Sequence, residues 1–142
     1  MIGESGADRV RAVVFWHVNL DNTPLAPYAL AYKAKYKEDW VWLPTHIAPE
    51  MLRMAIAKAG TDDPLKVALA LEGMRYNGPT GEVWMRPDDH QIMTPLYKVV
   101  FTRAGQPGVK YDAEDTGFGW KTENKLEMRD VIHPATCKVQ RP

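Results

Sequence analysis

The sequence predicts an α/β protein, on three observations. Residues 10–16 (VRAVVFW) are almost all apolar, β-branched or aromatic, which is typical of a buried strand. Residues 24–37 carry apolar side chains at helical spacing, with lysines between them that can face solvent. Two further β-prone runs, residues 82–86 and 96–102, come after a helical stretch. This mixed order of strands and helices places the chain in the α/β class.

The bulk composition describes one ordinary globular unit and excludes two classes of function. The 142 residues are 45% hydrophobic and 25% charged, which is enough apolar material for a single core. Lys and Arg number 18, as do Asp and Glu, so the formal net charge is zero and no basic run marks a nucleic-acid surface. The apolar runs are far shorter than a bilayer span. We therefore expect neither a nucleic-acid partner nor a membrane-spanning segment.

The two ends of the chain add expectations about location and redox chemistry. The first residues lack the basic stretch and apolar run of a secretory leader, so the chain as it stands is expected to remain in the cytoplasm. Cys137 is the single cysteine, which excludes an internal disulfide. Two alternatives stay open for it: a free thiol near the tail, or a cysteine whose partner lies on another segment.

Local signals predict three helices. Thr23 is expected to cap a helix that starts at Pro24, because threonine accepts a first-turn N–H and proline there loses no needed donor. A second helix is expected over residues 48–59, ending at Gly60. A third is expected over residues 64–73, on the same pattern of a capping side chain, Asp63, followed by proline.

Shorter β-prone runs complete the expected elements. Residues 40–43 predict a short strand, and the dense Gly, Pro and Asn content of residues 76–81 predicts a turn. Residues 82–86 and 96–102 are expected to pair as a hairpin across a long polar connection. Residues 121–128 alternate loosely and could form a last strand.

A search for reactive chemistry predicts no enzyme. The sequence contains no nucleophile elbow, phosphate loop, CxxC pair or HExxH pair. Asp88, Asp89 and His90 could be imagined in a metal site, but adjacent turn residues point in different directions, so a solvated turn is favoured. The histidines occupy four separate segments, at His17, His46, His90 and His133. We therefore expect no catalytic residue, no metal and no cofactor.

The aromatic residues are the most suggestive feature, because five Trp and six Tyr are a high load for this length. Trp16 and His17 lie where the first predicted strand ends, and Trp40 and Trp42 lie just before a helix. Ligands of open α/β sheets collect where strands end and helices begin, and aromatic walls often line such sites. For Trp40 and Trp42, ligand contact and core packing stay equally open, because strand alternation points them to opposite faces.

Several segments in a specific order carry a family resemblance over nearly the whole chain. They are GESGADRV with the strand after it, TPLAPYALAYKAKY, DDPLKVALALEGM, GPTGEVWMRPDDHQ and PLYKVVF. In this order they resemble the C-terminal portion of the branched-chain-amino-acid (Leu/Ile/Val) type of periplasmic solute-binding protein of ABC transporters. The resemblance implies a partial type I periplasmic-binding-protein fold, in which two Rossmann-like α/β lobes hold the ligand between them.

The resemblance also implies a division of the chain. Residues 1–16 would be the last part of the second lobe, and residues 17–23 would be a hinge crossing. Residues 24–103 would be the C-terminal part of the first lobe. Residues 104–142 would form the return crossing and the tail.

For the site, the resemblance implies contact with a solute that is an amino acid or a related small carboxylate. Trp40 matches the position where family members place an apolar side chain against the ligand. The remaining expected ligand-binding residues lie at strand ends and at a helix start: Trp16, His17, Trp42, Thr45 and His46. The implied partner of the intact protein is the membrane permease of an ABC transporter, and the implied location is the periplasm.

Intact members of that family are longer, so this chain is expected to be a C-terminal fragment that binds solute weakly or not at all. Helices made to cover an absent sheet expose apolar stripes, so the chain is expected to self-associate or to fold only partly. Two other classes of function stay open: a free-standing binder of small ligands, and a protein-interaction module that uses exposed helical faces.

Overall fold

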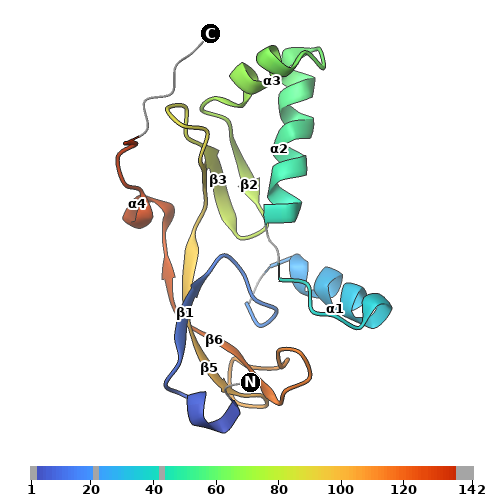
Figure 1. Ribbon diagram of the computed structural model, residues 1–142, viewed down its shortest axis with the longest axis vertical. Coiled ribbons are helices and arrows are strands. Elements are labelled where there is room, and N and C mark those ends of the chain that lie inside the picture. The colour runs from blue at the N-terminus through green and yellow to red at the C-terminus, as the bar shows by residue number, and fades with distance from the viewer. Residues whose placement is uncertain (1–2, 21–22, 42–43, 137–142) are drawn as a thin grey trace. The chain divides into compact units, whose positions relative to one another are not determined.

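The computed structural model describes residues 3–20, 23–41 and 44–136 (Figure 1). The chain divides into two compact units. The first unit comprises Met1–Trp42 with Leu96–Leu126, and the second comprises Leu43–Pro95 with Glu127–Pro142. Each unit is described by itself.

The first unit is built on a three-stranded antiparallel sheet in the order β1-β5-β6. Its elements are the short 3-10 helix η1 (Gly3–Gly6), β1 (Arg11–Val14), α1 (Leu25–Tyr36), β5 (Leu96–Arg103) and β6 (Phe118–Leu126). Val13 lies opposite Lys98, and the β5–β6 register shifts between Lys98 and Val99. The buried core of this unit contains mostly β5 residues and residues near α1: Trp16, Leu25, Ala29, Trp40, Tyr97, Val99, Val100, Val109 and Phe118.

Strand β1 differs from the buried strand that the sequence predicts. It is shorter than expected, and Val13 and Phe15 are 59% and 46% exposed. Exposed and half-buried side chains alternate along β1, so the sheet face that carries Arg11 and Val13 is not covered by another described element. A run of apolar residues indicates burial on both faces only where neighbours cover both faces.

Helix α1 confirms the predicted helix, but its start is built differently. Thr23 does not cap the helix; its hydroxyl instead accepts a hydrogen bond from the Trp16 indole N–H at 3.3 Å. Leu25 and Ala29, one turn apart, bury one side of the helix. The helix ends at Tyr36 and is capped by Lys37, whose left-handed backbone (φ 61°) directs its N–H to the Lys33 carbonyl at 2.9 Å.

The second unit combines a helical pair with a small antiparallel sheet in the order β2-β3-β4. Its elements are α2 (Pro44–Ala59), α3 (Pro64–Leu71), β2 (Arg75–Gly78), β3 (Gly81–Met85), β4 (Ile92–Met93) and α4 (Met128–Val131). Ile47, Met51 and Ala55 recur every four residues on α2 and are almost fully buried.

The turn between α2 and α3 confirms the predicted capping. Gly60 follows α2 with φ +66° and donates its N–H to the Ile56 carbonyl at 2.9 Å. The Asp63 carboxylate accepts the Lys66 N–H at 3.0 Å, and Pro64 occupies the first position of α3. Short-range signals were sufficient here because all the bonding groups lie within a few residues.

The predicted hairpin between residues 82–86 and 96–102 is wrong. β3 pairs with β2 and β4, whereas β5 pairs with β1 and β6 in the first unit. The predicted turn at residues 76–81 is a tight hairpin whose first half is strand β2. Gly78 permits the close pairing, because a Cβ there would lie 2.5 Å from the Val83 Cγ2 atom.

Two other expectations concern the segment around Trp40 and the division of the chain. Trp40 and Val41 are not in a strand, and residues 42–43 lie outside the described residues. The two compact units divide after Trp42, Pro95 and Leu126. The lobe and hinge division expected at residues 17–23 and 104 stays a prediction. Residues 24–41 belong to the first unit because α1 buries Leu25 and Ala29 there.

Candidate functional site

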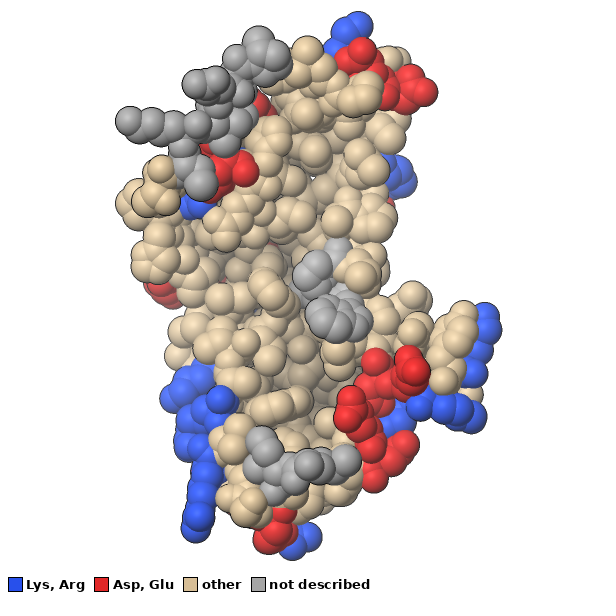
Figure 2. All heavy atoms as spheres, in the orientation of Figure 1, with Lys and Arg blue, Asp and Glu red and all other residues tan. Residues whose placement is uncertain are grey.

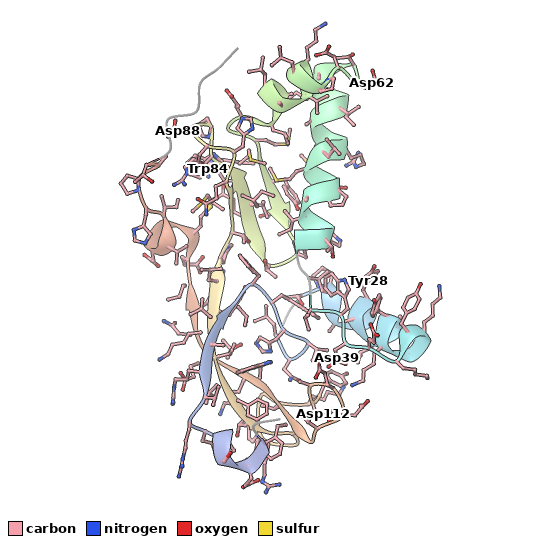
Figure 3. All side chains as sticks on the ribbon, in the orientation of Figure 1. Tyr28, Asp39, Asp62, Trp84, Asp88 and Asp112 are labelled. Atoms are coloured by element: carbon pink, nitrogen blue, oxygen red, sulfur yellow. The ribbon has the colours of Figure 1, made fainter. Side chains whose placement is uncertain are left out.

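Three aromatic side chains of the first unit form a contiguous wall, which we call the aromatic wall. The Trp16 and Trp40 rings lie 5.1 Å apart at 59°, and the Tyr28 ring meets Trp40 edge-on at 5.3 Å. Both tryptophans are more than nine-tenths buried, whereas Tyr28 is 54% exposed (Figure 3). Tilted and edge-on pairs are the favoured aromatic geometries. The wall thus has a rigid inner pair and one ring open to solvent.

Residues that follow Trp16 in the sequence form hydrogen bonds with strand β6 and with the loop before it. His17 is buried, and its Nε2 lies 2.8 Å from the Thr122 hydroxyl. Asn19 donates to the Tyr111 carbonyl at 2.7 Å and accepts the Tyr111 N–H at 2.7 Å. One asparagine thus satisfies both backbone groups of a residue far away in the sequence.

Ion pairs and a hydrogen bond hold the segment that directly precedes Trp40. The Lys33 ammonium group lies 2.9 Å from Asp39 and 2.8 Å from Asp115. Its pKa is raised above the ordinary value, mainly by the hydrogen bond to Asp115 and further by Asp39. Asp39 also accepts the Glu114 N–H at 2.7 Å. Figure 2 shows acidic side chains gathered beside basic ones near α1, where these residues lie.

The structure brings together only part of the predicted site. Trp16, His17 and Trp40 lie in the first unit and are buried. Thr45 and His46 belong to the second unit, where both are exposed in the first turn of α2. Trp42 lies outside the described residues.

Sequence reasoning missed Tyr28, Asn19 and the Lys33–Asp39 pair. Tyr28 was visible only as one of the apolar positions of a helix. Asn19 lies in a polar connection, and nothing local points to Tyr111 as its partner. Asp39 directly precedes Trp40, which is the one signal that could have drawn attention to it.

The second unit contains a polar cluster around the predicted turn after β3. Arg86 is buried, and its guanidinium group donates to the Asp89 carboxylate at 2.8 Å and to the Gln91 side chain at 2.6 Å. The Arg86 hydrogen bond holds the pKa of Asp89 below its ordinary value. His90 lies 3.2 Å from Glu72. Asp89 and His90 therefore engage different partners in this turn, but the Asp89 side chain is only 13% exposed, so the turn is not solvated throughout as the sequence favours.

Neither a metal-binding cluster nor a membrane-spanning helix is found in the described ranges. Among residues 3–20, 23–41 and 44–136, no group of three or more His, Cys, Asp or Glu side chains is arranged to hold a metal ion. Across the same ranges, none of the helices combines the length and the apolar character that a bilayer crossing requires.

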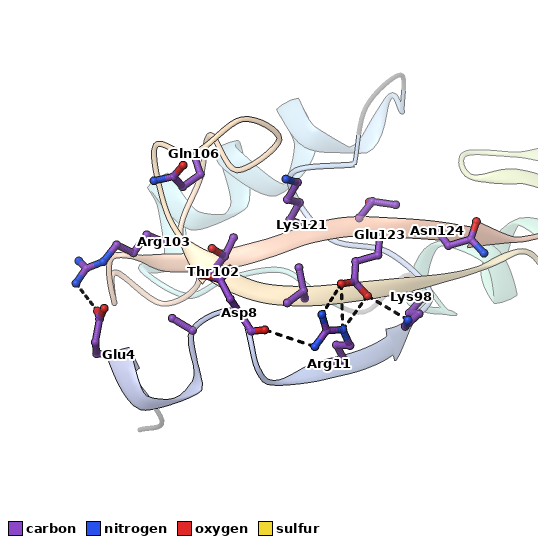
Figure 4. Close-up of a pocket in the computed structure, with 13 residues that line it drawn as sticks. Glu4, Asp8, Arg11, Lys98, Thr102, Arg103, Gln106, Lys121, Glu123 and Asn124 are labelled. Carbon is purple, nitrogen blue, oxygen red and sulfur yellow. Dashed lines mark hydrogen bonds and ion pairs between the residues drawn. The ribbon is translucent and has the colours of Figure 1, made fainter.

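A polar hollow of about 790 Å³ lies on the β1-β5-β6 sheet (Figure 4). Glu123 accepts from Arg11 at 3.0 Å and pairs with Lys98 at 3.2 Å, and the hydrogen bond from Arg11 is the main cause of its lowered pKa. Charges of both signs therefore neutralise each other inside the hollow. Its lining includes neither Trp16 nor Trp40, so it is separate from the aromatic wall.

Comparisons with known proteins assign the family. The family model described as periplasmic binding protein matches residues 1–106, which is most of the chain. The chain belongs to the periplasmic binding protein family. This family consists of periplasmic solute-binding proteins rather than enzymes, as the sequence resemblance predicted.

Curated relatives place the chain within a longer protein type. It is 28% identical to the Leu/Ile/Val-binding protein homolog 4 of Brucella abortus, in an alignment that covers 85% of this chain and 32% of the relative. The homolog of Brucella suis matches equally well. This periplasmic binding protein chain therefore spans about a third of the length of the curated relatives it matches.

Solved structures show the same fold. One is the leucine-, isoleucine-, valine-, threonine- and alanine-binding protein of Brucella ovis in its closed conformation, with a TM-score of 0.76 and 19% identity. The match covers 93% of this chain and 35% of the Brucella ovis chain. Another is a solute-binding protein of an ABC transporter of Rhodopseudomonas palustris in complex with 3,4-dihydroxybenzoic acid, with a TM-score of 0.70 and 15% identity. This match covers 89% of this chain and 32% of the Rhodopseudomonas palustris chain. The partial type I periplasmic-binding-protein fold is confirmed.

Proposed function

We propose that this chain contributes to the solute site of an ABC importer's periplasmic binding protein, and that its solute is an amino acid or a related small carboxylate. The observation that carries the proposal is the family match over residues 1–106, within which the aromatic wall lies. The implied location is the periplasm, and the implied partner is the membrane permease. The function is binding and delivery, with no chemical step.

The aromatic wall supports a solute with an apolar body. Tyr28, which is 54% exposed and stands edge-on against the buried Trp40, presents ring surface that can pack against aliphatic or aromatic groups, and such packing is the usual lining of small-molecule sites. The similar Brucella ovis protein is described as binding leucine, isoleucine, valine, threonine and alanine, and the Rhodopseudomonas palustris protein is in complex with 3,4-dihydroxybenzoic acid. These ligands share a carboxylate, and several also carry an apolar group.

The two compact units support a lobe assignment at the structural divisions. We assign Met1–Trp42 with Leu96–Leu126 to one lobe and Leu43–Pro95 to the other. Ligands that contact both lobes of such proteins favour the closed state, and this difference in affinity drives closure. Thr45 and His46 are exposed at the start of α2 and stay proposed solute contacts of the second unit.

The direct test is a tryptophan-fluorescence and calorimetric titration of the 142-residue chain with leucine and with 3,4-dihydroxybenzoate. We expect saturable binding with a Kd of about 1 mM, because only part of the contacts of a longer relative are present. Trp40→Leu should abolish the binding. Trp84→Leu, which removes a tryptophan of the second unit, is the matched control and should keep it. Absence of saturable binding for both solutes would count against the proposal.

A second candidate function, association through helical faces, is favoured by one observation. Leu52 and Ile56 on α2, and Leu65 and Leu69 on α3, are each 39–49% exposed at one-turn spacing. We expect this face to bring two copies of the chain together. Sedimentation velocity of the wild type and of Leu52→Glu tests it: the variant should be monomeric, and a monomeric wild type would exclude self-association.

A further inference from the structure

We propose that Lys33, Asp39 and Asp115 form a positioning triad that sets the place of Trp40 in the aromatic wall. In the same arrangement, residues 111–122 act as a common anchor for both tryptophans of the wall. The functional consequence rests on the proposed solute-binding function, whereas the structural part stands on the geometry alone. The triad therefore determines solute affinity without contacting the solute.

The triad joins three segments that are distant in the sequence. Lys33 projects from the last turns of α1 and bridges Asp39 and Asp115 at 2.9 and 2.8 Å. The second carboxylate oxygen of Asp39 accepts the Glu114 N–H at 2.7 Å. Because Asp39 directly precedes Trp40, these bonds fix the backbone from which the Trp40 ring projects. Figure 3 labels Asp39 and, in the neighbouring loop, Asp112.

The Trp16 half of the wall is tied to the same anchor. His17, next to Trp16, contacts Thr122, and Asn19 is bonded to both backbone groups of Tyr111. The segments that carry the two tryptophans are therefore both bonded to residues 111–122, and we attribute the ring separation of 5.1 Å to this shared attachment. If residues 111–122 lost their bonds to one of the two segments, the distance and the angle between the Trp16 and Trp40 rings would change.

The anchor loop needs these ties to keep its shape. Glu114 and Asp115 are consecutive non-glycine residues with left-handed backbones, at φ 53° and 55°. Such a conformation is unfavourable for residues with a side chain and persists only where surrounding contacts hold it. Within the loop, Asp112 accepts the Gly117 N–H at 2.8 Å and the Ala113 N–H donates to the Phe118 carbonyl at 2.7 Å. The contacts that reach Glu114 and Asp115 from other segments are the Asp39 carboxylate on the Glu114 N–H and the Lys33 ammonium group on Asp115. Loss of the triad should therefore release the loop and the Trp40 backbone together.

The test uses the exciton couplet that two closely spaced tryptophans produce in the circular dichroism spectrum. The couplet is assigned to the wall by its loss in Trp40→Phe. Lys33→Met and Asp39→Asn should largely remove it and weaken solute binding about tenfold. The matched controls, Lys35→Met and Glu38→Gln, delete the same charges from adjacent exposed positions and should leave the couplet unchanged. Lys33→Arg should restore the couplet, because a guanidinium group can bridge two carboxylates.

The outcomes separate the triad from the proposed function. An unchanged couplet in folded Lys33→Met and Asp39→Asn overturns the triad. If both variants lose their helical signal, Asp115→Asn decides, because its side chain is 80% exposed and the substitution is mild. Loss of the couplet in that variant supports the triad, and an intact couplet overturns it. A wild type that has the couplet but binds neither leucine nor 3,4-dihydroxybenzoate contradicts the proposed function and leaves the triad standing.

Discussion

The side-chain hydrogen bonds and ion pairs inside the first unit join residues much further apart in the sequence than most of those inside the second unit. In the first unit, Asn19 bonds to Tyr111 across 92 residues and His17 contacts Thr122 across 105 residues. In the second unit, Arg53 pairs with Glu50 across three residues. The helix pair and the hairpin of the second unit close short loops, whereas the first unit closes long ones.

The difference matters because ordering a longer loop costs more conformational entropy. Bonds that close a long loop must be specific and well satisfied to keep the ends in place. The first unit uses buried or partly buried polar ties for this, and its aromatic wall is positioned by them. The second unit depends on an apolar helix face, and its polar bonds combine caps and surface pairs with the buried Arg86 cluster, in which Arg86 also donates to the His133 carbonyl across 47 residues.

The largest expected effect separates core from surface in the second unit. Met51→Ala removes a side chain that is 1% exposed, and we expect it to lower the free energy of unfolding by about 3 kcal/mol. The neighbouring Leu52→Ala is the control, because Leu52 is 48% exposed, and it should cost less than about 1 kcal/mol. Urea denaturation measures both. Equal losses would contradict the assignment of Met51 to the core.

The next effect tests a long-range tie of the first unit. Asn19→Ala leaves the partly buried N–H and carbonyl of Tyr111 without their side-chain partner, which should cost about 2 kcal/mol. Asn124→Ala, on an exposed position of β6, should be close to neutral. Hydrogen exchange of the Tyr111 amide gives the local readout. Unchanged protection of that amide in Asn19→Ala would show that the tie is dispensable.

A smaller effect is expected for a local tie in the second unit. Asp63→Ala removes the cap on the Lys66 N–H and should cost about 1 kcal/mol. Asp62→Ala removes the same charge one residue earlier and serves as the control. Thermal unfolding followed by circular dichroism compares the two. If both variants melt alike, the capping bond contributes nothing beyond its charge.

The smallest effects come from exposed ion pairs and depend on pH and salt. Arg11 depresses the folded-state pKa of Glu123, so the contribution of this carboxylate is present above its unfolded-state pKa and is lost as the pH falls through the folded-state value. The stability gap between wild type and Glu123→Gln should therefore be largest near neutral pH and vanish in acid. High salt should reduce it. Asp89→Asn should show the same pH trend with less salt dependence, because the Arg86–Asp89 pair is better buried.

Short-range signals in the sequence were enough to predict helices α1, α2 and α3, although α2 begins at Pro44 rather than at the predicted residue 48 and includes Pro49 in its interior. Asp63 and Pro64 marked the start of α3, and Gly60 marked the end of α2, because caps and left-handed glycines act within one turn. The hairpin prediction failed because periodicity identifies a strand but not its partner. The choice of β2 for β3 depended on the turn at residues 79–80 and on the missing side chain of Gly78.

The sequence by itself determined the family, the helices and the aromatic character of the candidate site, because composition, caps and motif order are local properties. The tertiary structure alone decided that Trp16 and Trp40 form one wall, and that Asn19 and Asp39 fasten it. It also decided that β1 is an exposed edge strand. The physical reason is that pairing, burial and long-range hydrogen bonds are properties of two segments at once, and local spacing records only one of them.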